Sequence, residues 1–186
     1  MNPLDEARSS LRQPDMTSVA AIDARAAQVL RPTGALARLD RLAAWLAGWQ
    51  RTDRPSVDHA VALVFAADHG VAAAGVSAYP VEITAAMLDA FRSGVSSINV
   101  MARQLGATVE AVDVGVGVPT ADLRVQAAMS PERFAEAVEH GRRSVVRHDA
   151  ADVILLGEMG IGNTTAAAAV CASLCGGSVD DWVGRM

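Results

Sequence analysis

A glycine-rich stretch, GEMGIGNTT from Gly157 to Thr165, carries the residues best suited to chemistry. It lies between an apolar run typical of a buried strand and an alanine-rich run typical of a helix. Backbone N–H groups at the start of a helix bind phosphate, so a turn of this kind predicts an anion site. The spacing approaches the P-loop pattern, but Asn163 stands where that motif needs a lysine to reach the outer phosphates. The turn therefore predicts a site for a sugar monophosphate and disfavours a nucleoside triphosphate hydrolase.

Glu158 is the only carboxylate in this turn. The dipole of the following helix favours its ionised form, and an ionised carboxylate repels a phosphate placed directly on it. Glu158 is therefore expected to accept hydrogen bonds from ribose hydroxyls or to stabilise a cationic ring. The phosphate is expected at Gly160, Gly162 and the N–H groups of Asn163 to Thr165.

A second polar group, Asp68-His69-Gly70, follows the apolar run AVALVFAA. Its side chains suit a metal-ligand pair, an acid/base pair or a pair that shapes a loop. One Asp and one His do not make a metal site without a third ligand. We favour the third interpretation, in which Asp68 holds a turn by accepting hydrogen bonds from backbone N–H groups. The remaining histidines are expected to be solvated: His59, His140 and His148.

The loop GVSAYP feeds a predicted helix and contains the chain's only tyrosine, Tyr79. Two interpretations stay open for this segment. One is a turn with a helix cap, and the other places Tyr79 over a flat aromatic ligand. Met87 follows about two helical turns along the same helix, where a methionine is usually a plain core residue.

Apolar periodicity predicts the elements that position these residues. Three short apolar runs predict strands at 60–67, 107–117 and 151–158, and amphipathic or alanine-rich runs between them predict helices at 81–94, 96–106, 130–150 and 164–175. Two earlier helices are expected at 17–30, with Thr17 as its cap, and at 35–49, after a loose lead-in over residues 1–15. Residues 119–129 are expected to form a long loop or a short edge piece.

Alternating strands and helices predict an α/β fold with a mostly parallel, Rossmann-like sheet flanked by helices. We expect a helical segment at residues 1–55 and a partial α/β domain at residues 56–186. Ligands of such sheets bind beyond the carboxyl ends of the strands. All three predicted strands end in polar or glycine-rich pieces, ADHGV, DVGVG and GEMGIGNTT, which places one site at that edge.

Composition limits the class of protein. The chain has 186 residues, is 51% hydrophobic and 20% charged, and has a net charge of −5, which is typical of a globular protein and argues against nucleic-acid binding. No signal peptide or membrane-spanning run is visible, so a cytoplasmic protein is expected. Cys171 and Cys175 lie on one helical face without nearby ligands, which predicts small buried residues on a packed helix.

Four segments carry a resemblance to a known family: RPTGALARLDRLA, VFAADHGVAAAGVSAYPVEITAAM, SSINVMARQLGATVEAVDVGV and GEMGIGNTTAAAA. In this order they resemble the nicotinate-nucleotide:dimethylbenzimidazole phosphoribosyltransferases of cobalamin assembly, the CobT family. The resemblance covers about residues 31–185. It implies transfer of phosphoribose from nicotinate mononucleotide to 5,6-dimethylbenzimidazole, giving α-ribazole 5′-phosphate and nicotinate, without a cofactor or metal. It also implies a homodimer.

The resemblance implies a role for each matching residue. Gly160, Gly162, Asn163 and Thr164 match the family's glycine-rich motif near the nucleotide, and Glu158 matches its glutamate, as an electrostatic and orienting helper. Tyr79 and Met87 fall where the family lines its base pocket. Asp68 and His69 match an ADHG motif that shapes the floor of the site.

Family members are roughly twice as long, and the glutamate proposed as their catalytic base lies in a C-terminal half that has no counterpart here. The resemblance therefore implies a truncated, N-terminal portion with little or no transferase activity of its own. The alternative is a non-catalytic module that binds a nucleotide or a benzimidazole, with or without a partner chain that supplies the other half.

Overall fold

The chain forms two compact units, residues 1–58 and 59–186, which are described separately. Their structure, a computed structural model, describes residues 3–184. Within that range, no helix combines the length and apolar character that crossing a membrane requires.

The first unit contains three helices, α1 (Pro3–Ser10), α2 (Met16–Gln28) and α3 (Ala37–Gln50). The prediction of an irregular segment at residues 1–15 is therefore wrong for Pro3–Ser10, which form a helix. The predicted cap is also wrong. Asp15 begins α2, because its carboxylate accepts hydrogen bonds from the Thr17 N–H at 3.1 Å and the Ser18 N–H at 3.3 Å, which are among the donors that a helix start leaves unpaired.

Small side chains pack α2 against α3. The buried residues of this contact are Ile22, Ala44 and Ala47, flanked by Val19 and Ala43. Arg31 closes the connection between the two helices, since its guanidinium lies 2.5 Å from the Asp40 carboxylate. The RPTGALARLD segment thus connects the two helices, and the ion pair between its first and last residues stabilises the connection.

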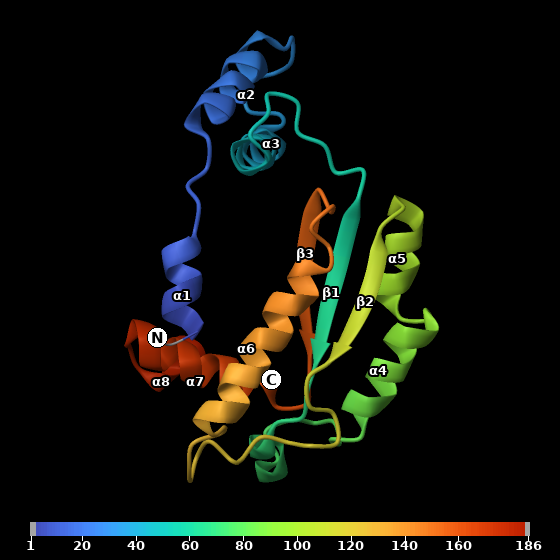
Figure 1. Ribbon diagram of the computed structural model, residues 1–186, viewed down its shortest axis with the longest axis vertical. Coiled ribbons are helices and arrows are strands. Elements are labelled where there is room, and N and C mark those ends of the chain that lie inside the picture. Colours follow the sequence, from blue (N-terminus) through green and yellow to red (C-terminus); the bar gives the residue numbers. More distant parts are fainter. Residues whose placement is uncertain (1–2, 185–186) are drawn as a thin grey trace. The chain divides into compact units, whose positions relative to one another are not determined.

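The second unit is built on a three-stranded parallel sheet (Figure 1). Its strands are β1 (Ala60–Ala66), β2 (Thr108–Asp113) and β3 (Val153–Met159), in the order β2-β1-β3. β1 lies in the centre and is buried along most of its length, with Leu63 fully enclosed. A continuous apolar run is what a strand covered on both faces requires, so the predicted α/β fold with a parallel sheet is confirmed.

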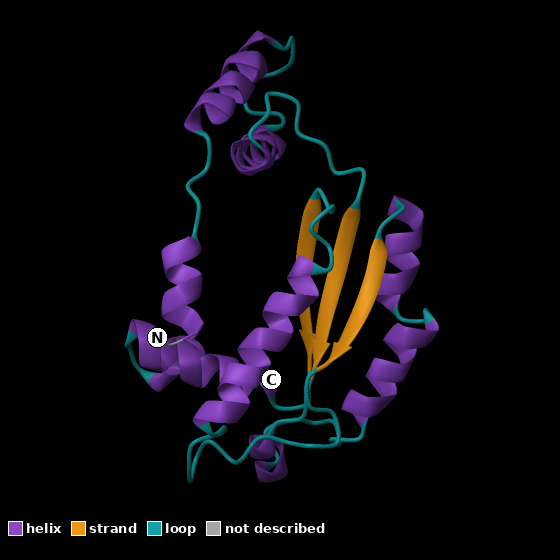
Figure 2. Cartoon of the chain, in the orientation of Figure 1, coloured by secondary structure: helices purple, strands orange, loops and turns teal. Residues whose placement is uncertain are grey.

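Helices connect the strands. A 3₁₀ turn, η1 (Gly70–Ala74), and two helices, α4 (Ile83–Ser93) and α5 (Ser97–Leu105), lead from β1 to β2, and both helices pack against β2 (Figure 2). The helix α6 (Pro131–Val146) leads back across the sheet to β3, and a right-handed connection places it on the opposite face from α4 and α5.

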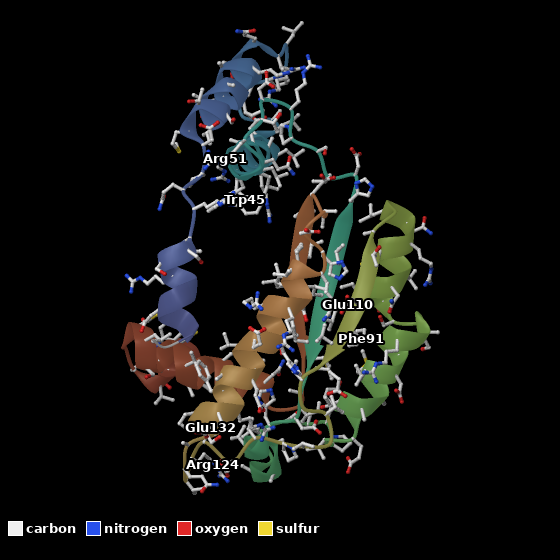
Figure 3. The ribbon with its side chains drawn as sticks, viewed as in Figure 1. Trp45, Arg51, Phe91, Glu110, Arg124 and Glu132 are labelled. Carbon is white, nitrogen blue, oxygen red and sulfur yellow. The ribbon has the colours of Figure 1, made fainter. Side chains whose placement is uncertain are left out.

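The edge strand β2 carries a charged side chain, Glu110, near its middle (Figure 3). Its carboxylate accepts hydrogen bonds from Arg147 at 2.5 Å and pairs with the His148 ring at 2.6 Å. These partners come from the end of α6, so they tie that helix to β2. The prediction of a solvated His148 is wrong, because its partner lies far away in the sequence.

The last two helices are α7 (Asn163–Cys175) and α8 (Val179–Trp182). No residue of α7 is buried, and its cysteines are partly exposed at Cys171 and exposed at Cys175. The helix was predicted, but the prediction that it packs and buries both cysteines is wrong for this chain.

Candidate functional site

The carboxyl ends of all three strands meet at one edge of the sheet, where the arrowheads converge in Figure 2. Backbone hydrogen bonds join the segments that follow them: the Ala67 N–H donates to the Met159 carbonyl at 3.1 Å, and the Asp68 N–H donates to the Gly115 carbonyl at 3.3 Å. The three polar pieces singled out in the sequence are therefore neighbours in space.

Asp68 connects the loop after β1 to the loop after β2. Its Oδ2 accepts a hydrogen bond from the Gly117 N–H at 2.7 Å, and the Thr120 N–H donates to its backbone carbonyl at 3.1 Å. Asp68 thus holds a turn through a backbone N–H, as the favoured interpretation of its sequence context has it. Its second oxygen, Oδ1, is buried without a hydrogen-bond partner among the described residues, which leaves one unpaired acceptor just after β1.

His69 lies beside the glycine-rich turn. A Cβ built on Gly160 would lie 3.0 Å from both Cδ2 and Nε2 of the ring. Burial lowers the pKa of His69 below its ordinary value, and the negative charges of Glu158 and Asp68 oppose that shift without cancelling it. Burial therefore favours the neutral form of the His69 ring, although the charges of Glu158 and Asp68 act on it.

The lowered pKa of His69 makes the stability of the fold depend on pH. The unfolded chain binds the proton more readily than the folded chain, so the contribution of neutral His69 to folding stability is fully present above about pH 6.5 and is lost as the pH falls through the folded-state pKa. We expect His69→Gln to reduce the decrease in unfolding free energy between pH 8 and pH 5, as measured by urea unfolding. His140→Gln, at an exposed position, is the control and should keep it. An unchanged decrease in His69→Gln would contradict the assignment.

The turn after β3 delivers the chain into α7. Gly162 takes a left-handed conformation with φ 88° and precedes the helix, a geometry that glycine adopts without strain. Asn163 then makes two contacts: its Oδ1 accepts a hydrogen bond from the Thr164 N–H at 2.8 Å, and its Nδ2 donates to the Glu158 carboxylate. The residue in the lysine position of a P-loop thus orients the glutamate of the same turn.

Thr84, in the first turn of α4, is fully buried, and its Oγ1 accepts a hydrogen bond from the Ile161 N–H at 3.1 Å. This contact ties the helix that carries Met87 to the middle of the glycine-rich turn. Sequence reasoning missed Thr84, since nothing in ITAAM distinguishes a buried acceptor from an ordinary helix residue.

We expect Thr84→Val to cost about 1–3 kcal/mol of unfolding free energy, because the Ile161 N–H would be left buried and unpaired. Thr84→Ser retains the hydroxyl and should cost less. The measurements are urea unfolding and hydrogen exchange at the Ile161 amide, which should quicken in the valine variant alone. Equal exchange rates in the two variants would show that the hydrogen bond does not hold the turn.

The positions of Tyr79 and Met87 do not test their predicted role in a base pocket. Tyr79 is 67% exposed, and its backbone N–H donates to the Ser77 hydroxyl at 3.2 Å, so its ring lies largely in solvent. Met87 is partly buried on α4. Their place in a base pocket stays a prediction.

A cavity of about 480 Å³ opens beside the first turn of α7. Val76, from the loop GVSAYP, and Thr165, from the glycine-rich turn, line it together with three residues that the sequence did not single out: Ala168, Trp182 and Val183. Thr164 joins them, which places the cavity next to the predicted phosphate turn. Within residues 3–184, no group of three or more His, Cys, Asp or Glu side chains is arranged to hold a metal ion.

A family model described as "Phosphoribosyltransferase" matches residues 11–186 of the chain. The chain belongs to this phosphoribosyltransferase family. Its relatives include proteins named nicotinate-nucleotide--dimethylbenzimidazole phosphoribosyltransferase from Roseobacter denitrificans, 44% identical over 98% of this chain and 54% of that protein, and from Cereibacter sphaeroides, 42% identical over 95% of this chain and 52% of that protein.

The fold of this family member agrees with a crystal structure of CobT from Thermus thermophilus, with a TM-score of 0.83 and 38% identity. That match covers 91% of this chain and 56% of the Thermus chain. The chain thus spans about half the length of the relatives it matches. The resemblance stated from the four sequence segments is confirmed.

Proposed function

We propose that this chain carries the nucleotide-binding part of an enzyme that transfers phosphoribose from nicotinate mononucleotide to 5,6-dimethylbenzimidazole. The observation that carries the proposal is the match of residues 11–186 to a phosphoribosyltransferase family, together with the names of relatives more than 40% identical. The products are α-ribazole 5′-phosphate and nicotinate.

The reaction replaces one C1′–N bond with another. A benzimidazole ring nitrogen forms a bond to C1′ from the face opposite the leaving group, while the electrons of the broken C1′–N bond return to the pyridinium nitrogen of nicotinate. The sugar passes through an oxocarbenium-like state, as in glycoside hydrolysis. The N–H proton of the benzimidazole must go to a base, and we assign that base to the part of the enzyme that this chain does not span.

The end of β3 suits the charged portion of the substrate. We assign the phosphate to the start of α7, where backbone N–H groups and the helix dipole favour an anion. Glu158, oriented by Asn163, faces the cationic ring or the ribose as a supporting group. The remaining assignments are the phosphate turn, Gly160, Gly162 and Thr164; the floor of the site, Asp68 and His69; and the base pocket, Tyr79 and Met87.

The proposal extends to the setting of the enzyme. The division of the chain after Asp58 supports a helical segment at residues 1–55 and a partial transferase domain at residues 56–186. The net charge of −5 supports small-molecule substrates and no nucleic acid. We place the enzyme in the cytoplasm as a homodimer, an assignment that rests on the family resemblance.

The test uses the purified chain with nicotinate mononucleotide and dimethylbenzimidazole. Calorimetry measures nucleotide binding, and mass spectrometry detects α-ribazole phosphate. We expect binding of nicotinate mononucleotide with little or no product. Glu158→Gln should weaken binding about tenfold, the loss of one charge-assisted contact, and Glu136→Gln, at an exposed position on α6, should not.

The outcomes separate the alternatives. A folded chain that does not bind the nucleotide would overturn the proposal. Turnover at an enzyme-like rate by this chain alone would refute the assignment of the base to the part it does not span. Nucleotide binding that never leads to product, even when the remaining part of a relative is supplied, would favour a non-catalytic binding module.

A further inference from the structure

The loop that carries Tyr79 joins η1 to α4 and is far less buried than the residues at its two ends. Residues 75–82 form bends and turns without a regular element, and Tyr79 and Val81 are both exposed. Val71 in η1 and Thr84 in α4, by contrast, are fully buried. Segments with few buried contacts open more readily than the elements beside them. The shape of this loop therefore depends on what holds its ends.

Both ends of the Tyr79 loop are attached to the glycine-rich turn. After the loop, Thr84 Oγ1 accepts the hydrogen bond from the Ile161 N–H at 3.1 Å, and both residues are buried. Before the loop, η1 lies directly against Gly162, since a Cβ built there would lie 3.4 Å from the Ala72 nitrogen and 3.4 Å from Val71 Cγ1. The two attachment points, Ile161 and Gly162, are adjacent residues. A shift of the turn is therefore transmitted to both ends of the loop at once.

The same turn leads into the start of α7, where we place the phosphate. Gly162 directly precedes Asn163, the first residue of that helix. On its other side the turn has little freedom, because a Cβ at Gly160 would lie 2.3 Å from the Ala67 carbonyl oxygen. An anion bound at the first N–H groups of α7 thus acts on a turn that is packed against the end of β1 and attached to the Tyr79 loop.

We propose that Thr84 is a positioning residue that couples two substrate subsites, so that a nucleotide bound at the glycine-rich turn orders the Tyr79 loop and strengthens the binding of an aromatic base there. Thr84 contacts neither ligand and acts through Ile161. The coupling is reciprocal, so the base strengthens nucleotide binding by the same factor. The inference rests on the proposed function, from which it takes the nucleotide at the turn and the base at Tyr79 and Met87.

The coupling has a use in the proposed reaction. The base nitrogen forms its bond to C1′ as the bond to nicotinate breaks, and water at the same place would compete for C1′. Loops that close when a substrate binds keep water from the reacting atoms. A loop ordered by the nucleotide therefore admits the base when the phosphoribosyl donor is already in place.

The test compares affinities and does not depend on turnover. Calorimetry measures the affinity of the full chain for dimethylbenzimidazole with and without saturating nicotinate mononucleotide. We expect binding at least about fivefold tighter with the nucleotide. Thr84→Val should lower this ratio at least about twofold, and Thr84→Ser, which keeps the hydroxyl, should retain it. A substitution that only loosened the fold would weaken base binding under both conditions and leave their ratio unchanged.

Hydrogen exchange of the unsubstituted chain provides a second measurement that needs no variant. Addition of nicotinate mononucleotide should slow the exchange of the amides in residues 75–82. The matched control is Ser144→Ala, which removes another fully buried hydroxyl of the same unit, one that donates to the His140 carbonyl at 2.9 Å within α6. This variant should leave the ratio of the two affinities unchanged.

The outcomes distinguish this inference from the proposed function. A chain that does not bind the nucleotide would overturn both. A chain that binds the nucleotide would overturn the coupling alone if the loop gained no protection, if dimethylbenzimidazole did not bind, or if its affinity were the same with and without the nucleotide. A ratio that Thr84→Val leaves as it is would also overturn the role of Thr84.

Discussion

Gly70→Ala is expected to destabilise the sheet-containing unit by about 3 kcal/mol, at the upper end of the cost of inserting a methyl group into a packed site. A Cβ at this position would lie 2.3 Å from the Thr120 carbonyl oxygen, 2.7 Å from the Ala121 carbonyl carbon and 2.9 Å from the Asp122 nitrogen. All three are backbone atoms and cannot rotate away. The Gly70 N–H also donates to the Thr120 hydroxyl at 3.2 Å, so the two segments must separate to accept the methyl group.

Urea unfolding of Gly70→Ala measures this cost. Gly141→Ala is the control, because Gly141 lies inside α6 with no atom within 4 Å of the added Cβ. An alanine there should stabilise the helix by about 0.5–1 kcal/mol. The two alanines should therefore shift the unfolding midpoint in opposite directions. A Gly70→Ala chain as stable as the original would show that the loops after β1 and β2 are not packed as closely as described.

The sequence sufficed to predict the fold class and the edge at which the site lies. The apolar run of β1 has no polar interruption, so its burial on both faces could be inferred without knowing its neighbours. Glycine and charge at the ends of three parallel strands placed ADHGV, DVGVG and GEMGIGNTT at one edge. Hydrogen bonds between Ala67 and Met159 and between Asp68 and Gly115 agree with that inference.

Contacts between distant segments were not predictable from one sequence. Nothing in the sequence near His148 indicates that Glu110 is its partner. Likewise, nothing near Thr84 indicates that its hydroxyl accepts a hydrogen bond from the Ile161 N–H. Glu158 and Asn163, which form a hydrogen bond, are only five residues apart in the sequence, but their contact depends on the left-handed turn at Gly162. A side chain's partner is set by how the chain folds back, which periodicity does not encode.

The packing of α7 shows a second limit. The alanine-rich sequence predicted the helix, and its apolar character predicted burial of Cys171 and Cys175. The helix is present and the burial is not. Composition reports the environment for which a segment is suited, whereas burial depends on which other segments are present to cover it.

Gly160→Ala is the second substitution with a large expected effect, about 2 kcal/mol of unfolding free energy. The added Cβ would lie 2.3 Å from the Ala67 carbonyl oxygen and 3.0 Å from the His69 ring. The ring can turn aside, but the carbonyl belongs to the segment that hydrogen-bonds to Met159 and cannot. The glycine-rich turn would therefore move away from the end of β1, and the start of α7 would move with it.

Gly157→Ala is a matched control for this substitution, since its Cβ would meet only Val64 Cγ2 at 3.6 Å and the Leu63 carbonyl at 3.7 Å, which are ordinary contacts. Urea unfolding should separate the two alanines by about 2 kcal/mol, and nicotinate mononucleotide binding should weaken only in Gly160→Ala. Adding His69→Ala to Gly160→Ala tests the cause. Stability that stays low in the double variant assigns the cost to the Ala67 carbonyl, whereas full recovery would mean that the ring was the obstacle and that the turn itself is free to adjust.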